Sequence, residues 1–236
     1  MNLRKIASAA TALVAAGFLA GPANASLVLL SAENFQGTGL GASSTILTIE
    51  SPNNSSTETG SVGRAVGNPN DVIGGSNEKT GASQTQTRTL SQLGVSSAST
   101  LRVVFNALEP GGTLNSIDLT NLTLSIFSPT GALLFNSGAF ATVNFANTLT
   151  GAGNSGFVFG LDATQAAQAQ ALAFGAGFGN NLVGLAATAI NATGGFETFF
   201  VANTLGGGGG TAIPEPGTIA LFGAGLLALV AGRRRS

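Results

Sequence analysis

Alternating apolar and polar residues between positions 117 and 135 restrict the fold more than any other pattern in this chain. On one face of a short segment lie Leu122, Leu124 and Ile126, a spacing typical of a half-buried strand. The run Ser128–Gly131 follows, with proline second and glycine fourth, as a type I turn prefers. Ala132–Phe135 then returns as an apolar run. Residues 117–135 therefore predict a β-hairpin.

A break within this hairpin is also predicted, because Ile117 and Leu119 are out of phase with Leu122, which indicates a bulge near Asn121. Similar strand patterns occur along the whole middle of the chain. The further predicted strands are Thr45–Ile49, Leu101–Phe105, Gly156–Leu161, Leu182–Ile190 and Phe196–Ala202. Together these patterns predict a mainly β fold, an antiparallel β-sandwich of the jelly-roll or immunoglobulin-like type.

One helix interrupts the predicted strands. Asp162 can cap a helix whose third position is Gln165, and an alanine- and glutamine-rich run follows. We expect a short inserted helix near residues 163–173, stopped by glycines. Residues 51–100 contain few large apolar side chains, so this stretch is either a long surface excursion or locally disordered. We favour long loops with one short strand pair.

The N-terminal segment is typical of a secretory signal peptide. A basic start is followed by an apolar stretch and by Ala23-Asn24-Ala25, with small residues at both ends of the triplet. Signal peptidase is therefore expected to remove residues 1–25 and leave Ser26 at the new N-terminus. The domain expected outside the cytoplasm covers residues 26–205.

Missing residue types exclude several classes of chemistry. The chain has no Cys, His, Trp or Tyr. Disulfides and Ser-His-Asp or Cys-His catalysis are impossible, and zinc and copper sites are very unfavourable. We expect no enzyme activity, no cofactor and no catalytic or metal site. Nucleic-acid binding is not expected either, because the basic residues between the two ends are only Arg64, Lys79, Arg88 and Arg102.

Calcium is the metal whose ligands the sequence could supply. Oxygen-bearing side chains are found in Asn68–Asp71 and at Glu78, Glu109, Asp118 and Asp162. Their spacing matches no known calcium loop, and asparagine, proline and aspartate also make turns and helix caps. A polysaccharide- or calcium-binding module therefore stays open as an alternative function. A hydrolase would need two converging carboxylates and is disfavoured.

The C-terminal segment has three parts in a fixed order. After a glycine-rich linker at residues 206–213 come Pro214, Glu215 and Pro216, and then the apolar run Thr218–Gly232. As a helix this run spans about 22 Å, which is short for a hydrocarbon layer of about 30 Å. The chain ends with Arg233, Arg234 and Arg235, which favour a cytoplasmic C-terminus. We predict a C-terminal transmembrane helix.

These three parts resemble the PEP-CTERM sorting signal, with Ile213 where the common form has valine. The resemblance covers residues 213–236 and implies processing by an exosortase, a membrane-embedded transpeptidase-like enzyme of Gram-negative bacteria. It implies that Pro214-Glu215-Pro216 is the recognition motif, that Thr218–Gly232 is a transient anchor, and that Arg233–Arg235 stop transfer. Residues 214–236 would form the sorting segment.

Sequence and resemblance together predict an exported protein that is first anchored in the inner membrane and then reaches the cell surface or extracellular matrix. The expected role is structural or adhesive, in biofilm or exopolysaccharide. The expected partners are signal peptidase, exosortase, the membrane through the C-terminal helix, and exopolysaccharide as a candidate ligand.

Overall fold

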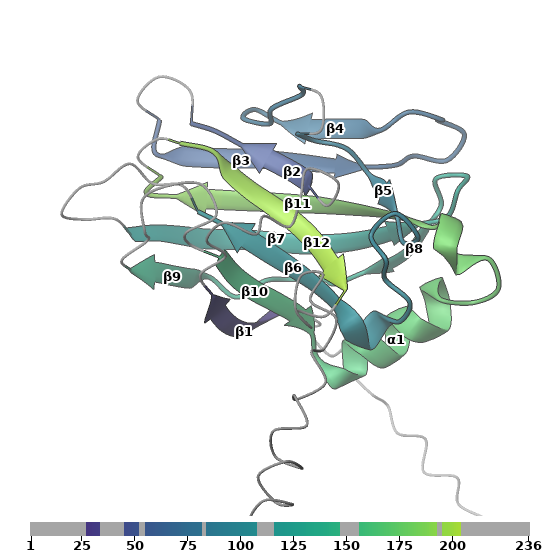
Figure 1. The fold of residues 1–236 in the computed structure, drawn as a ribbon. Coiled ribbons are helices and arrows are strands. Elements are labelled where there is room, and N and C mark those ends of the chain that lie inside the picture. The colour runs from purple at the N-terminus through teal and green to yellow at the C-terminus, as the bar shows by residue number, and fades with distance from the viewer. Residues whose placement is uncertain are drawn as a thin grey trace, which may run out of the picture.

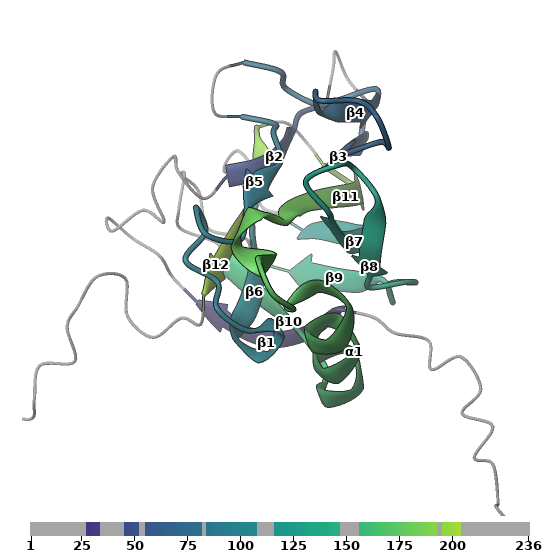
Figure 2. The ribbon, with the colours of Figure 1, turned by 90° about the vertical axis from the view of Figure 1, so that its right-hand side faces the viewer.

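The computed structural model describes residues 27–33, 45–51, 55–81, 84–107, 116–146, 156–192 and 195–203. These residues form two antiparallel sheets around one core, with a single α-helix at one side (Figures 1 and 2). The prediction of a mainly β, antiparallel fold with one helix is confirmed. The finer expectation of a jelly-roll or immunoglobulin-like sandwich stays a prediction.

The five-stranded sheet has the order β1-β10-β6-β12-β2, in which every neighbouring pair is antiparallel. Its strands are β1 (Leu27–Glu33), β10 (Gly156–Leu161), β6 (Leu101–Asn106), β12 (Glu197–Asn203) and β2 (Thr45–Ile49). The two strands nearest the start of the chain, β1 and β2, therefore lie at opposite edges of this sheet.

The seven-stranded sheet has the order β4-β3-β11-β7-β8, with β5 also paired to β11 and β9 also paired to β7. Its strands are β3 (Thr57–Gly63), β4 (Val72–Gly75), β5 (Arg88–Thr89), β7 (Ser116–Phe127), β8 (Leu133–Asn136), β9 (Val143–Ala146) and β11 (Leu182–Ile190). The long strands β7 and β11 pair along most of their length and form the centre of the sheet.

Phenylalanine rings join the two sheets at the core. Phe105 of β6 stacks on Phe199 of β12 at 4.9 Å between ring centroids, and it meets Phe145 of β9 at 5.5 Å. Phe145 also lies 4.0 Å from Phe157 of β10. Because β9 belongs to the seven-stranded sheet and the other strands to the five-stranded one, these rings hold the layers together. Full burial of a phenylalanine side chain contributes roughly 2–3 kcal/mol to the free energy of folding.

The predicted hairpin is present and contains the predicted break. Strands β7 and β8 pair antiparallel, and the Gly131 amide donates to the Ser128 carbonyl oxygen at 2.9 Å, closing the turn. The register of β7 on β11 shifts between Thr188 and Ala189, opposite Asn121 and Leu119. Thr120 is the extra residue of this bulge. It brings the out-of-phase Ile117 and Leu119 to the same buried face as Leu122.

The helix α1 (Ala163–Ala173) begins and ends as predicted. The Gln165 amide donates to Asp162 Oδ1 at 2.8 Å, so Asp162 is the N-cap. Gln165 itself does not complete a capping box, because its side chain is fully buried and its Nε2 donates to the Ser137 carbonyl oxygen at 3.0 Å. Here the need to satisfy a buried carbonyl outweighs the local capping contact.

Residues 51–100 contain the expected short strand pair, but they also contribute more to the sheets than expected. The polar strand β3 lies between β4 and β11, and β5 extends the same side of β11. Short 3₁₀ turns occur at η2 (Ala98–Thr100) and, later in the chain, η3 (Phe178–Asn180). Glycine at position 60 lets β3 approach β2, since a Cβ there would lie 2.5 Å from Ile49 Cγ2.

Candidate functional site

The first and last described strands bring both ends of the domain to one side. Val28 of β1 pairs with Gly160, Gly160 pairs with Arg102, and Arg102 pairs with Ala202 of β12. These residues form one row across the five-stranded sheet. Three strand spacings separate the outer members of the row, so the start of β1 lies about 14 Å from the end of β12. We call the end of the domain marked by Leu27 and Asn203 the tether end.

The predicted processing residues lie outside the described residues. They are Ala23, Ala25 and Ser26 at the signal-peptide junction, Pro214, Glu215 and Pro216 in the sorting motif, and Arg233, Arg234 and Arg235 at the C-terminus. Within the part of the chain that the structure describes, no helix is long and apolar enough to cross a membrane. The predicted helix Thr218–Gly232 also lies outside that part.

Acidic side chains gather at the opposite end of the strands, which we call the acidic end. Glu197 opens β12 and pairs with Ile49, which in turn bridges to Glu78. Glu58 of β3 and Asp118 of β7 lie opposite Ala189 and Ile190, at the same end of β11. Glu50 adds a further carboxylate and forms an ion pair with Lys79. This end of the strands is therefore rich in carboxylates.

Glu58 of the acidic end has a fully buried side chain, as Glu197 also does. Glu58 Oε1 accepts hydrogen bonds from the Ser51 amide and the Ser51 hydroxyl, both at 2.6 Å. Glu58 Oε2 has no hydrogen-bond partner among the described residues. A buried carboxylate is costly unless it is bonded, so the two Ser51 contacts explain how it is accommodated. Glu58 thereby fastens the chain after β2 to β3.

The candidate calcium ligands do not converge. Asn68 Oδ1 accepts from the Asn70 amide at 2.9 Å, which makes a turn. Asp71 accepts from the Thr87 amide and hydroxyl and pairs with Arg64 at 3.2 Å. Asp162 caps α1, and Glu109 lies outside the described residues. The remaining two, Glu78 and Asp118, lie at the acidic end. Among the residues that the structure describes, no group of three or more acidic, histidine or cysteine side chains could hold a metal ion.

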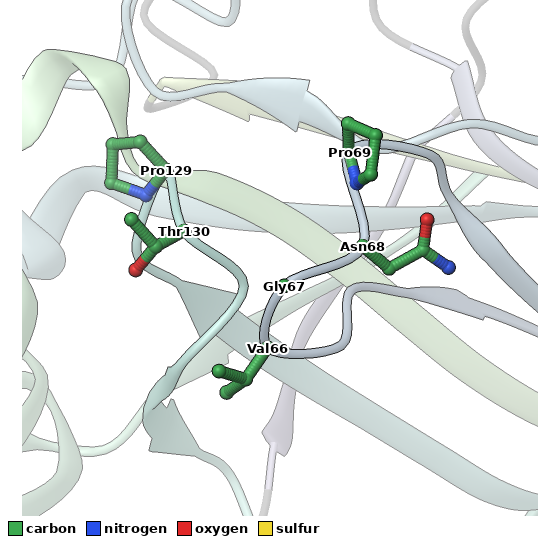
Figure 3. Close-up of a pocket in the computed structure, with 6 residues that line it drawn as sticks. All are labelled: Val66, Gly67, Asn68, Pro69, Pro129 and Thr130. Atoms are coloured by element: carbon green, nitrogen blue, oxygen red, sulfur yellow. The ribbon is translucent and has the colours of Figure 1, made fainter.

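A shallow hollow of about 410 Å³ lies between two turns, lined by Val66, Gly67, Asn68, Pro69, Pro129 and Thr130. Figure 3 shows that the Asn68 side chain is directed away from Pro129 and Thr130. Thr130 Oγ1 lies 2.9 Å from Ser128 Oγ, so that hydroxyl is already hydrogen-bonded. Ligand pockets usually combine apolar walls with converging polar groups. No polar groups converge among the six residues that line this hollow.

Two features of this geometry were not predicted from the sequence. The burial of Glu58 was missed because β3 is polar and was expected to be mostly loop. The signal that could have found it is the alternation of Glu58 with Gly60 and Val62, all of which are buried. The apolar edge strand β1 was missed because it directly follows the predicted cleavage site.

Comparison with known protein families gives a match at the C-terminal end of the chain. Residues 212–235 match the PEP-CTERM protein-sorting motif. No curated protein and no solved structure matches the chain. The motif implies an exported protein that associates with the membrane and is then sorted to the surface by an exosortase. The C-terminal segment of this chain is therefore a PEP-CTERM sorting motif, as its Pro-Glu-Pro triplet, apolar run and arginine cluster predict.

Proposed function

We propose that this chain is a surface or extracellular-matrix protein with a structural or adhesive role in biofilm or exopolysaccharide. The observation that carries the proposal is the sorting motif at residues 212–235, which follows the last strand after a glycine-rich stretch. Signal peptidase would remove residues 1–25, and the apolar helix would hold the protein in the inner membrane until exosortase acts. Residues 26–205 would then serve outside the cell as a folded body.

We further propose that the domain works without catalysis. The chain has no histidine and no cysteine, so the usual base and the usual strong nucleophile are both missing. Its carboxylates are few and many are committed to structure, as Glu58 is to Ser51 and Asp162 to the start of α1. A role based on surface contact fits this composition better than a chemical one.

The test is the fate of a chain from which Pro214-Glu215-Pro216 has been deleted. We expect this variant to remain in the inner-membrane fraction with residues 218–236 attached, whereas the natural chain reaches the surface without them. A matched control deletes Gly207-Gly208-Gly209, which shortens the chain equally and leaves the motif intact. Measurement of the intact mass shows which residues remain at the two ends of the chain, including whether the N-terminal residue is Ser26 as expected. A natural chain that retains residues 218–236 in cells with active exosortase would contradict the proposal.

Polysaccharide binding by the same domain is a second candidate, and Phe196 favours it. Its side chain is 40% exposed at the acidic end, with Lys79 Nζ 5.4 Å from the ring centroid. An exposed ring beside charged groups is a surface on which a sugar can stack. A glycan array with the natural protein and with Phe196→Ser tests this, with Leu133→Ser as control because Leu133 is also exposed. Equal signals from all three proteins would count against the candidate.

A further inference from the structure

The edge strand β1 carries the longest run of exposed apolar side chains among the described residues. Leu27 faces the core and is 2% exposed, whereas Val28, Leu29 and Leu30 are 37%, 43% and 50% exposed. Among the described strands, β1 pairs with β10 alone, so one edge of its backbone has no neighbouring strand. An apolar edge of this kind is unfavourable in water and normally has a partner.

The place of β1 in the fold restricts what that partner can be. It begins at the tether end, about 14 Å from the end of β12. From Asn203, only residues 204–213 precede the sorting triplet at Pro214. A glycine-rich coil of that length covers about 17 Å on average, and about 35 Å when fully extended. As long as the tail is anchored, β1 stays near the bilayer.

The chemistry around β1 suits a lipid surface. Residues 27–32 carry no charged side chain, so placing this part of the strand against lipid buries no charged side chain. A Cβ on Gly160 would lie 2.8 Å from Leu30 Cδ1 and 3.4 Å from Arg102 Nη1, so an arginine lies beside the apolar run. Apolar side chains next to a cation are the composition found at membrane interfaces. The acidic end lies at the far end of the strands.

We propose that the β1 edge, defined as Val28, Leu29 and Leu30, rests on the outer leaflet of the inner membrane while the chain is anchored. This inference rests on the proposed anchoring by the C-terminal helix. A short tether raises the effective concentration of the edge at the bilayer to the millimolar range, so a weak contact is well populated. The contact holds the tether end against the membrane in which exosortase is embedded. It is lost when the tail is removed.

The test uses the full mature chain, residues 26–236, reconstituted in vesicles of phosphatidylethanolamine and phosphatidylglycerol. Because the chain has no cysteine, Leu29→Cys gives a single site for an environment-sensitive fluorophore. The matched control is Ile73→Cys, which is 38% exposed on β4. Figures 1 and 2 show β1 and β4 at opposite sides of the molecule. The measured quantity is the quenching of the fluorophore by lipids that carry a spin label on the acyl chain.

We expect the quenching lipid to remove most of the fluorescence at position 29 and little at position 73. Insertion of a long glycine-serine segment after Gly210 should weaken the quenching at 29, because it lowers the effective concentration. Equal quenching at the two positions would overturn the inference. Protection at position 29 that rises with the protein-to-lipid ratio, without lipid quenching, would also overturn it and identify a second copy of the chain as the partner.

Two controls distinguish a failure of this inference from a failure of the proposed anchoring on which it rests. Circular dichroism must show that the labelled chains are folded, and Val28→Cys replaces Leu29→Cys if the latter is not. Flotation of the protein with the vesicles reports whether the tail inserts. If no chain floats with the vesicles, the anchoring itself is wrong, and the inference is wrong with it. If the chains float and the quenching is equal, the anchoring stands and only the contact of β1 with lipid is wrong.

Discussion

Gly131 shows how a single residue fixes the contact between two turns. It has a φ of +86°, and a Cβ at this position would lie 2.1 Å from the Ala65 carbonyl oxygen. Gly67 has a similar φ of +79° but open space around it. The Gly67 amide donates to the Thr130 carbonyl oxygen at 3.3 Å. The two glycines therefore separate the effect of backbone conformation from the effect of steric contact.

We predict that Gly131→Ala lowers the free energy of unfolding by about 3 kcal/mol, because strain and overlap add. Gly67→Ala should cost about 1 kcal/mol, from the left-handed conformation alone. Urea unfolding followed by circular dichroism measures both values, since a chain without Trp or Tyr has little intrinsic fluorescence to follow. Equal losses for the two variants would show that the approach to Ala65 is relaxed in solution.

Glu58 gives a second prediction at the scale of one residue. Glu58→Ala removes the acceptor of two hydrogen bonds from Ser51 and should lower the free energy of unfolding by about 3 kcal/mol. Glu58→Gln keeps an oxygen in place and avoids burying a charge, so its loss should stay within about 1 kcal/mol. The same urea experiment compares them. If the alanine variant is as stable as the natural chain, Glu58 does not fasten β3.

The N-cap of α1 gives a prediction at the scale of a secondary-structure element. Asp162 Oδ1 accepts from the Gln165 amide, so Asp162→Ala should lower the free energy of unfolding by about 1 kcal/mol. Asp162→Asn keeps a side-chain acceptor and should lose much less. Thermal unfolding by circular dichroism compares the two variants. Equal losses would mean that the charge of Asp162, and not its hydrogen bond, stabilises the helix.

Elements with a strong local pattern were predictable from the sequence, and those that depend on distant contacts were not. The bounds of β2, β10, β11 and α1 follow from alternation, helix propensity and capping. The strand β3 did not follow, because its pairing with β11 joins residues far apart in the chain and its own side chains are mostly polar. The direction of the Gln165 side chain was missed for a similar reason, since its partner Ser137 lies 28 residues earlier in the chain, just after β8.

At the scale of the whole molecule, the sorting motif was predictable because its recognition elements are contiguous in sequence. Its three parts lie within residues 212–235, and no fold is needed to bring them together. The tether end and the acidic end were not predictable, because each depends on the strand order. Only the pairing of β1, β10, β6 and β12 places Val28 and Ala202 in one row. Strand order is a global property that short patterns do not determine.

The row from Val28 to Ala202 leads to a last prediction, which concerns the whole domain. Because about 14 Å separates the start of β1 from the end of β12, a linker of about six glycine and serine residues, spanning up to about 20 Å, can join Asn203 to Leu27. New ends can then be opened between β6 and β7, in the connection between Ala107 and Ser116. We expect this circular permutant to unfold cooperatively, with a melting temperature close to that of the domain in its natural order. A permutant joined by a single glycine cannot span the gap and should lose β1 from the sheet. If both permutants melt alike, the ends of β1 and β12 do not have the separation that the row requires.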